Sequence, residues 1–282
     1  MRLDEQGFSD LGDSLEEMKL RAQDRGWRFP YLYDGETQAM SRAYGPAATP
    51  HVFVFDAARK LRFVGRLDDN ENPAKATTDD AREAILALLA DKPVPVAQTK
   101  VFGCSIKWSD KRGSVKEGLD RWAQEPVTLA PTDLAGVRAV ARGDAKKLRL
   151  VNVWATWCGP CVIEFPDLVS LHRIYRGRDF EIVTLNADDS QQQGKVKAFL
   201  ESQQASMRNL AFDKGDSYAL IEALDAKWQG ALPYTMLIAP GGKVLYRSDG
   251  AFGMRELRKA IVGWLGSYYH SVPGAGTSSG GR

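Results

Sequence analysis

The chain has 282 residues, of which 44% are hydrophobic and 26% charged, a composition typical of a globular protein with one large or two ordinary domains. Its 38 basic and 36 acidic residues nearly balance, so charge gives no reason to expect a nucleic-acid partner. No stretch approaches the roughly 18 apolar residues of a transmembrane span. The first residues, MRLDEQGFSDLGDS, contain no apolar core of a signal peptide.

The first segment, from about residue 15 to residue 108, is predicted to fold in the order helix, strand, helix, hairpin, helix. Ser14 and Glu17 have the spacing of a helix-capping pair, and Gly26 would end that helix. The predicted elements are SLEEMKLRAQDRG (helix), RFPYLYD (strand), ETQAMSRAYG (helix), HVFVFD and KLRFVGRL (hairpin), and TDDAREAILALLADK (amphipathic helix).

A polar stretch, SDKRGSVKEGLDRWAQEP, reads as a connector to a second segment that begins near Val127. Two nearly continuous apolar runs, LRLVNVWA and FEIVTLNAD, are typical of buried parallel strands. The other predicted elements are VTLAPTDLAGVRAVA (edge hairpin), a helix from Gly159 to LHRIYRG, KVKAFLESQQ and YALIEALDAKW (helices), YTMLIAP and KVLYRSDG (hairpin), and MRELRKAIVGWLGSYY (closing helix). We therefore expect a domain at 1–108, a linker at 109–126, a second domain at 127–269 and a flexible tail at 270–282.

The two segments share one pattern. TPHVFVFDAARKL in the first segment and LPYTMLIAPGGKV in the second both read as a proline, a strand, a turn and a second strand. Lys60 follows Pro50 at the interval at which Lys243 follows Pro233. Only the second copy is preceded by a strand–helix–strand portion with a cysteine pair. The first segment therefore repeats only the later part of the second.

Cys158 and Cys161 form a C-x-x-C pair where a buried strand meets a helix. The free N–H groups and the dipole at a helix N-terminus favour an anion, so Cys158 is expected to form a reactive thiolate there. Cys161, one turn on, could attack a mixed disulfide formed by Cys158 and release the product. Pro160 would lie in the first helical turn, where its missing N–H leaves no helical bond unmade.

Three further residues extend this site. Glu164, three residues after Cys161, is interpreted either as the proton acceptor for the resolving thiol or as a solvated helix residue. Pro233 opens a strand, and a cis bond there would expose backbone groups to a substrate chain; an ordinary trans proline is the alternative. Pro166 is expected to kink its helix.

Other interpretations of the cysteine pair remain open. Half of a zinc site would need further ligands, and the candidates are Cys104, His51, His172 and His270. The second open alternative is a buried structural pair. A haem attachment is dismissed, because it would need histidine where Val162 stands. We expect Cys104 to be a half-buried structural thiol rather than a redox partner.

The run WATWCGPCVIEFP resembles the active site of TlpA/ResA-type members of the thioredoxin superfamily, and the matching residues are Trp157, Cys158, Gly159, Pro160, Cys161, Glu164 and Pro166. The resemblance covers about 127–265, and Pro233 matches the cis-proline of that family. It implies an α/β thioredoxin-like fold with a central mixed sheet flanked by helices, and a thiol–disulfide oxidoreductase whose only redox group is the Cys158–Cys161 disulfide.

The same resemblance implies further properties. The Gly-Pro dipeptide resembles that of the reducing members, so we expect reduction of disulfide-bearing proteins at the expense of a thiol electron donor. It also favours the periplasm, with the cytoplasm as the alternative. No nucleic-acid partner, metal or other cofactor is expected.

The first segment resembles the later half of an AhpC/TSA-like redoxin domain, through FPYLYD, TPHVFVFD, LRFVGRLDDN and GCSIKW, with Pro50 at the cis-proline place. The cysteines of that family lie in the earlier half, and Ala48 stands where relatives often have cysteine, so no catalytic residue is assigned here. We expect Met1 to lie within a longer protein; the alternative is that half a domain is retained as a packing partner. The alternative functions are an antioxidant thiol peroxidase, and a first domain that is a non-catalytic partner-binding module.

Overall fold

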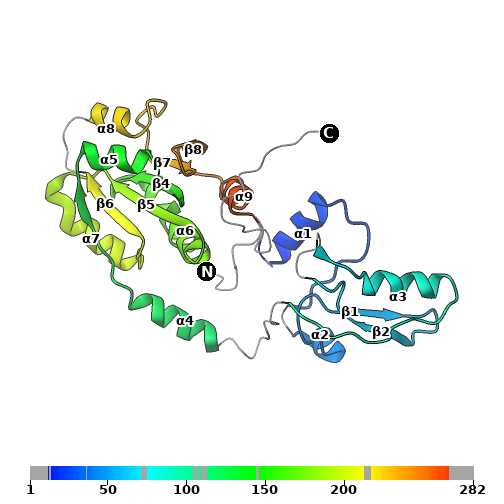
Figure 1. Ribbon diagram of the computed structural model, residues 1–282. Helices are drawn as coiled ribbons and strands as arrows, with labels where there is room; N and C mark the ends of the chain where they lie inside the picture. Colours follow the sequence, from blue (N-terminus) through cyan, green and yellow to red (C-terminus); the bar gives the residue numbers. More distant parts are fainter. Residues whose placement is uncertain are drawn as a thin grey trace. The chain divides into compact units, whose positions relative to one another are not determined.

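The computed structural model describes residues 12, 14–35, 37–70, 75–103, 106, 108, 113–143, 146–212 and 217–266 (Figure 1). The chain divides into two compact units. One combines Met1–Trp27 with Lys116–Arg282, and the other is Arg28–Val115. The first predicted helix thus groups with the larger unit. The boundaries at 108, 126 and 269 stay predictions.

A six-stranded mixed sheet forms the centre of the larger unit, in the order β3-β6-β5-β4-β7-β8. The first four strands of that order are parallel, and β7 runs antiparallel to both of its neighbours. The strands are β3 (Ala130–Thr132), β4 (Leu148–Trp154), β5 (Phe180–Asn186), β6 (Arg208–Phe212), β7 (Tyr234–Ile238) and β8 (Val244–Asp249). All residues of β4 are buried, as the apolar run LRLVNVWA predicted.

Helices cover both faces of this sheet (Figure 1). Apolar residues of α6 (Gly159–Tyr175), α7 (Gln193–Ser202) and α9 (Met254–Leu265) share one core with one face of the strands. Residues of α5 (Leu134–Ala141) and α8 (Ser217–Leu224) form a second core on the other face. A mixed sheet between two helix layers, with a β-α-β unit followed by a hairpin and a closing helix, is the thioredoxin-like fold that the sequence predicted.

The edge hairpin predicted at the start of the second segment is wrong. The chain instead forms the short strand β3, which is parallel to β6, and then α5. Asp133 is the N-cap of α5, because its side chain accepts a hydrogen bond of 2.8 Å from the backbone N–H of Gly136. Val137 and Val140, spaced for one helix face, are buried against the sheet. The helix-start signal therefore outweighs the β-propensity of the valines.

The predicted connector also contains regular structure, because α4 spans Gly113–Ala123. Its last turn is fixed to α6 within the larger unit. The guanidinium carbon of Arg173 lies 4.8 Å from the ring centre of Trp122, and Arg176 forms a salt bridge with Glu125. The connector is thus partly an element of the larger unit.

Helix α1 (Leu15–Asp24) belongs to the larger unit through charged contacts with α9. Asp24 pairs with Arg255, and Glu17 lies 3.8 Å from the guanidinium of the buried Arg258. Ser14 caps the helix as predicted, because its hydroxyl accepts a hydrogen bond from the Glu17 N–H and its own N–H donates to the Glu17 carboxylate. Elements more than two hundred positions apart in sequence therefore meet in one body.

The smaller unit contains α2 (Ala39–Tyr44), the antiparallel pair β1 (Val52–Phe55) and β2 (Leu61–Gly65), and α3 (Asp80–Leu89). Its core is small, with Phe63 packed against Ala81 and Ala84 of α3. The strand predicted at 28–34 does not form, and residues 28–33 are exposed. The hairpin and helix repeat the order of β7, β8 and α9, as the paired sequence pattern predicted, and the peptide bond before Pro50 is cis.

Within the described residues, no helix combines the length and apolarity that crossing a membrane requires. Helix α6 continues through Pro166 to Tyr175. The expected kink at Pro166 stays a prediction.

Replacing Asp133 tests the corrected start of the second segment. Asp133→Ala removes the cap of α5 and should lower the free energy of unfolding by about 1 kcal/mol, whereas Asp133→Ser, which keeps a capping oxygen, should lose only a few tenths. Urea denaturation of both variants measures the difference. Equal stability of the two variants would contradict a helix that starts at this residue.

Candidate active site

The cysteine pair lies where β4 passes into α6. Cys158 is the N-cap of α6, and its sulfur accepts a hydrogen bond of 3.3 Å from the Cys161 N–H. The two cysteines form a disulfide with an S–S distance of 2.05 Å. Pro160 occupies the first turn of the helix, as predicted. The helix N-terminus directs its free N–H groups at Cys158, where they stabilise a thiolate once the disulfide is reduced.

The two sulfurs differ in access. Cys158 keeps 6% of its surface exposed, and Cys161 none. Trp157, just before the pair, is 67% exposed. A substrate disulfide can therefore approach only Cys158, and Cys161 can react with an approaching molecule only through Cys158. The roles of Cys158 as the attacking thiol and Cys161 as the resolving thiol stay a proposal.

Glu164 is buried on the inner face of α6, and only 6% of its surface is exposed. The side-chain amide of Asn152 on β4 donates to Glu164 Oε1 at 2.9 Å, and the backbone N–H of Phe252 donates to Oε2 at 3.2 Å. The same amide also donates to Thr235 on β7 at 2.9 Å. The solvated-residue interpretation of Glu164 is therefore wrong. Its role as a proton acceptor stays a proposal.

Burial raises the pKa of Glu164 from 4.5 to about 7. The hydrogen bonds from Asn152 and Phe252 oppose this rise, and the nearby Asp167 carboxylate adds to it. A carboxyl group with a pKa close to neutral can both accept and release a proton under ordinary conditions. The arrangement thus provides an acid–base group on the helix that carries both cysteines.

A second buried carboxylate, Asp188, holds the loop in front of Cys158. It follows β5 and is 4% exposed. The backbone N–H and the hydroxyl of Thr156 donate to its two oxygens at 2.7 and 2.6 Å, and the amide of Asn186 donates at 2.7 Å. No sequence pattern distinguishes this residue, because an aspartate after a strand is an ordinary turn signal. A buried carboxylate needs donors, and only the fold reveals that Thr156 supplies two of them.

Pro233 lies beside the start of the cysteine loop. The peptide bond between Leu232 and Pro233 is cis, as expected. Tyr234 pairs with Val153 in the antiparallel β4–β7 ladder, so the register places Pro233 next to Trp154. The carbonyl of Pro233 accepts a hydrogen bond of 2.8 Å from Gly250. The sheet thus brings the two sequence-predicted parts of the site to the same end of β4.

Neither of the two described histidines among the candidate metal ligands groups with the cysteine pair. His172 is on α6, where burial, together with the charge of Arg176, lowers its pKa to about 4. His51 is in the smaller unit, and Cys104 and His270 lie outside the described residues. Among the residues that the structure describes, three or more potential metal ligands nowhere cluster together.

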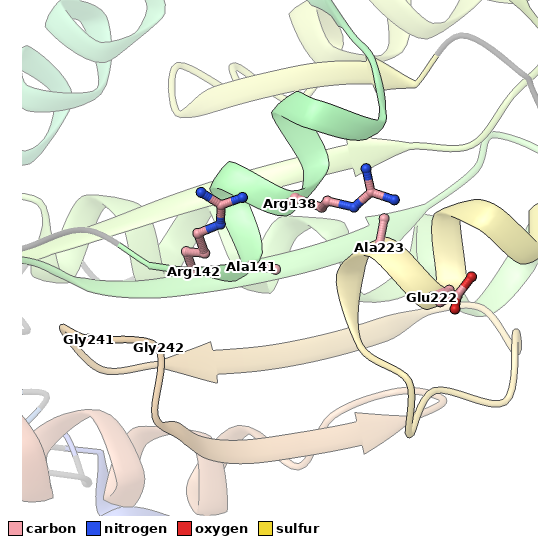
Figure 2. Close-up of a pocket in the computed structure, with 7 residues that line it drawn as sticks. All are labelled: Arg138, Ala141, Arg142, Glu222, Ala223, Gly241 and Gly242. Atoms are coloured by element: carbon pink, nitrogen blue, oxygen red, sulfur yellow. The ribbon is translucent and has the colours of Figure 1, made fainter.

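An open pocket lies elsewhere in the larger unit (Figure 2). It is lined by Arg138, Ala141, Arg142, Glu222, Ala223, Gly241 and Gly242. Its Gly241–Gly242 turn follows Ile238, which pairs with Arg149 near the start of β4. The disulfide follows the other end of β4. Figure 2 shows the guanidinium groups of Arg138 and Arg142 pointing in different directions, so the pocket neither belongs to the cysteine site nor focuses charge on one point.

A disulfide at the N-terminus of α6 and a thioredoxin-like sheet behind it define a thiol–disulfide oxidoreductase. The comparisons with known proteins agree. Residues 127–261 match the Redoxin family. The chain is 30% identical over 142 residues to the thiol-disulfide oxidoreductase ResA of a Bacillus cereus strain, and the match covers 50% of this chain and 75% of that protein.

The chain is also 31% identical over 165 residues to the thiol:disulfide interchange protein HelX of Rhodobacter capsulatus, covering 53% of this chain and 87% of that protein. Among solved structures, a thioredoxin-family thiol:disulfide interchange protein from Chlorobium tepidum TLS is 25% identical, with a TM-score of 0.37, over 45% of this chain and 84% of that one. The chain belongs to the ResA-type thiol–disulfide oxidoreductases, and its Redoxin domain lies in the larger unit. The resemblance of 1–108 to half a redoxin domain stays a prediction.

The raised pKa of Glu164 predicts a pH-dependent stability. Because the pKa is 4.5 unfolded and about 7 folded, the folded protein binds the proton more tightly. Ionising Glu164 therefore lowers the free energy of unfolding as the pH rises from 4.5 to 7. The free energy of unfolding of Glu164→Gln, measured relative to that of wild type, should therefore rise by about 3 kcal/mol between about pH 4 and about pH 8.5. Urea denaturation at several pH values measures this, with the exposed Glu222→Gln as control. A stability difference between Glu164→Gln and wild type that does not change with pH would show that burial does not raise the pKa of Glu164.

The Asp188 contacts predict a specific loss of stability. Asp188→Ala leaves two part-buried donors of Thr156 and the buried amide of Asn186 without their acceptor, and should cost about 3 kcal/mol of unfolding free energy. Thr156→Val removes only the hydroxyl contact and should cost about 1 kcal/mol. The adjacent, exposed Asp189→Ala is the matched control and should change stability by less than about 0.5 kcal/mol. If the variants at positions 188 and 189 were equally stable, Asp188 would not hold the loop.

Proposed function

We propose that the protein reduces disulfide bonds in other proteins. The Cys158 thiolate attacks one sulfur of the substrate disulfide, so that a mixed disulfide forms and one substrate thiolate leaves. The Cys161 thiolate then attacks Cys158, which restores the Cys158–Cys161 disulfide and releases the second substrate thiol. Two electrons pass from the cysteine pair to the substrate. A thiol electron donor then reduces the pair again.

The observation that carries this proposal is the unequal burial of the two cysteines, because Cys158 keeps 6% of its surface exposed and Cys161 none. In the proposed cycle Glu164, held by Asn152 and the Phe252 N–H, accepts the proton of the Cys161 thiol. Pro233 and its neighbouring backbone lie at the same end of β4 and would contact the substrate chain. Trp157, Gly159 and Pro160 would form the surface around Cys158.

The direction and the location of the reaction are part of the proposal. The Gly-Pro dipeptide between the cysteines supports reduction rather than oxidation of substrates. Kinship with ResA and HelX supports a periplasmic or other extracytoplasmic location. The smaller unit, whose described residues include no cysteine, would be a non-catalytic module that binds a partner.

Cysteine substitutions test the proposed cycle. In an insulin-reduction assay Cys158→Ser should fall to the uncatalysed rate, because it lacks the attacking thiol. Cys161→Ser should accumulate a covalent adduct with substrate that a non-reducing gel detects, because it cannot resolve the mixed disulfide. Cys104→Ser is the control and should keep wild-type turnover. Undiminished turnover of Cys158→Ser would disprove the cycle, and rapid turnover of hydrogen peroxide by the wild type would favour the peroxidase alternative.

A further inference from the structure

We propose that the outer face of α6 binds apolar residues of the substrate protein close to its disulfide, and that Ile163 distinguishes protein disulfides from small ones. The proposed surface consists of Trp157, Pro160, Ile163 and Pro166, and we call it the α6 strip. The inference rests on the proposed function and names the kind of substrate that the cysteine pair serves.

The first observation is the exposure of large apolar side chains beside the disulfide. Ile163 is 80% exposed and Trp157 is 67% exposed, although the inner face of α6 is fully packed. Isoleucine is β-branched and is not favoured on the solvent side of a helix. Neither packing in the core nor helix propensity therefore accounts for an exposed isoleucine at this position.

The second observation is the arrangement of these residues. Positions three residues apart are neighbours on a helix surface, so Ile163 lies beside both Pro160 and Pro166 on α6. All three are exposed. Trp157 and Cys158 stand at the N-terminal end of these three residues. The strip thus begins at the atom that the substrate must reach.

The third observation concerns charge and reach. Between Trp157 and Pro166 no ionisable residue is exposed, and the first exposed one is Asp167 at the far end of the strip. An apolar segment that binds there therefore removes no water from a charged side chain. Ile163 is five residues beyond Cys158, which corresponds to about 7 Å along the helix axis. An extended substrate chain covers that distance in about two residues. The strip therefore fits a polypeptide with an apolar side chain about two positions from its cysteine.

A small disulfide has no long polypeptide chain next to its sulfur atoms that could reach along the strip. Glutathione disulfide can reach Cys158 without covering Ile163, whereas a protein disulfide brings its neighbouring residues across the strip. Ile163 should then contribute to kcat/KM for proteins and not for glutathione disulfide. This difference in substrate preference separates a docking role from a structural one.

The test compares two substrates with the full-length protein. Ile163→Ser should lower kcat/KM for insulin reduction by about fivefold to tenfold, the usual effect of losing a central apolar contact, and should leave kcat/KM for glutathione disulfide within about twofold of wild type. Ile163→Leu should restore insulin reduction. Tyr218→Ser is the matched control, because Tyr218 is also 80% exposed but is on α8, across the sheet from α6.

Each other outcome overturns the inference in a recognisable way. Unchanged insulin reduction by Ile163→Ser would show that the strip binds no substrate. An equal loss with both substrates would show that Ile163 acts on the cysteines themselves. A wild-type protein that reduces neither substrate would instead remove the proposed function, and the inference with it.

Discussion

Burial of β4 on both faces is the constraint from which the site follows. The strand pairs with β5 on one edge and β7 on the other, and each of its residues is buried. The end of β4 is thus paired on both edges, and the short loop after Trp154 leads to Cys158 at the start of α6. The register of β7 brings Pro233 to that place, and the end of β5 brings Asp188. The surroundings of Cys158 thus depend on the pairing of three strands, β5, β4 and β7.

The two buried carboxylates beside this junction have different surroundings. Asp188 accepts three hydrogen bonds, from Thr156 and Asn186, and these fix a loop. Glu164 accepts two, and Asp167 adds negative charge close by. Burial is then only partly compensated, so the pKa of Glu164 is close to neutral. One carboxylate is suited to holding structure and the other to exchanging a proton.

The sequence predicted the parts of the site that are local. The spacing of Cys158 and Cys161, the strand before them and the helix after them are all contained in one short run of consecutive residues. The partners of Glu164 are different, because Phe252 is 88 positions away and no pattern links the two. Asp188 was missed for the same reason. The hairpin predicted near Val127 failed because the pairing partner of β3 is β6, which comes much later in the chain.

The division of the chain has a topological consequence. The smaller unit is an insertion, because α1 precedes it, most of α4 follows it, and both ends of the insertion continue into the same body. The ion pairs of α1 with α9 join the chain before the insertion to the chain after it. A single backbone cleavage after the smaller unit would therefore not release it, since α1 would still tether it to α9. Separation would require cleavage on both sides, or that single cleavage together with disruption of the α1 contacts.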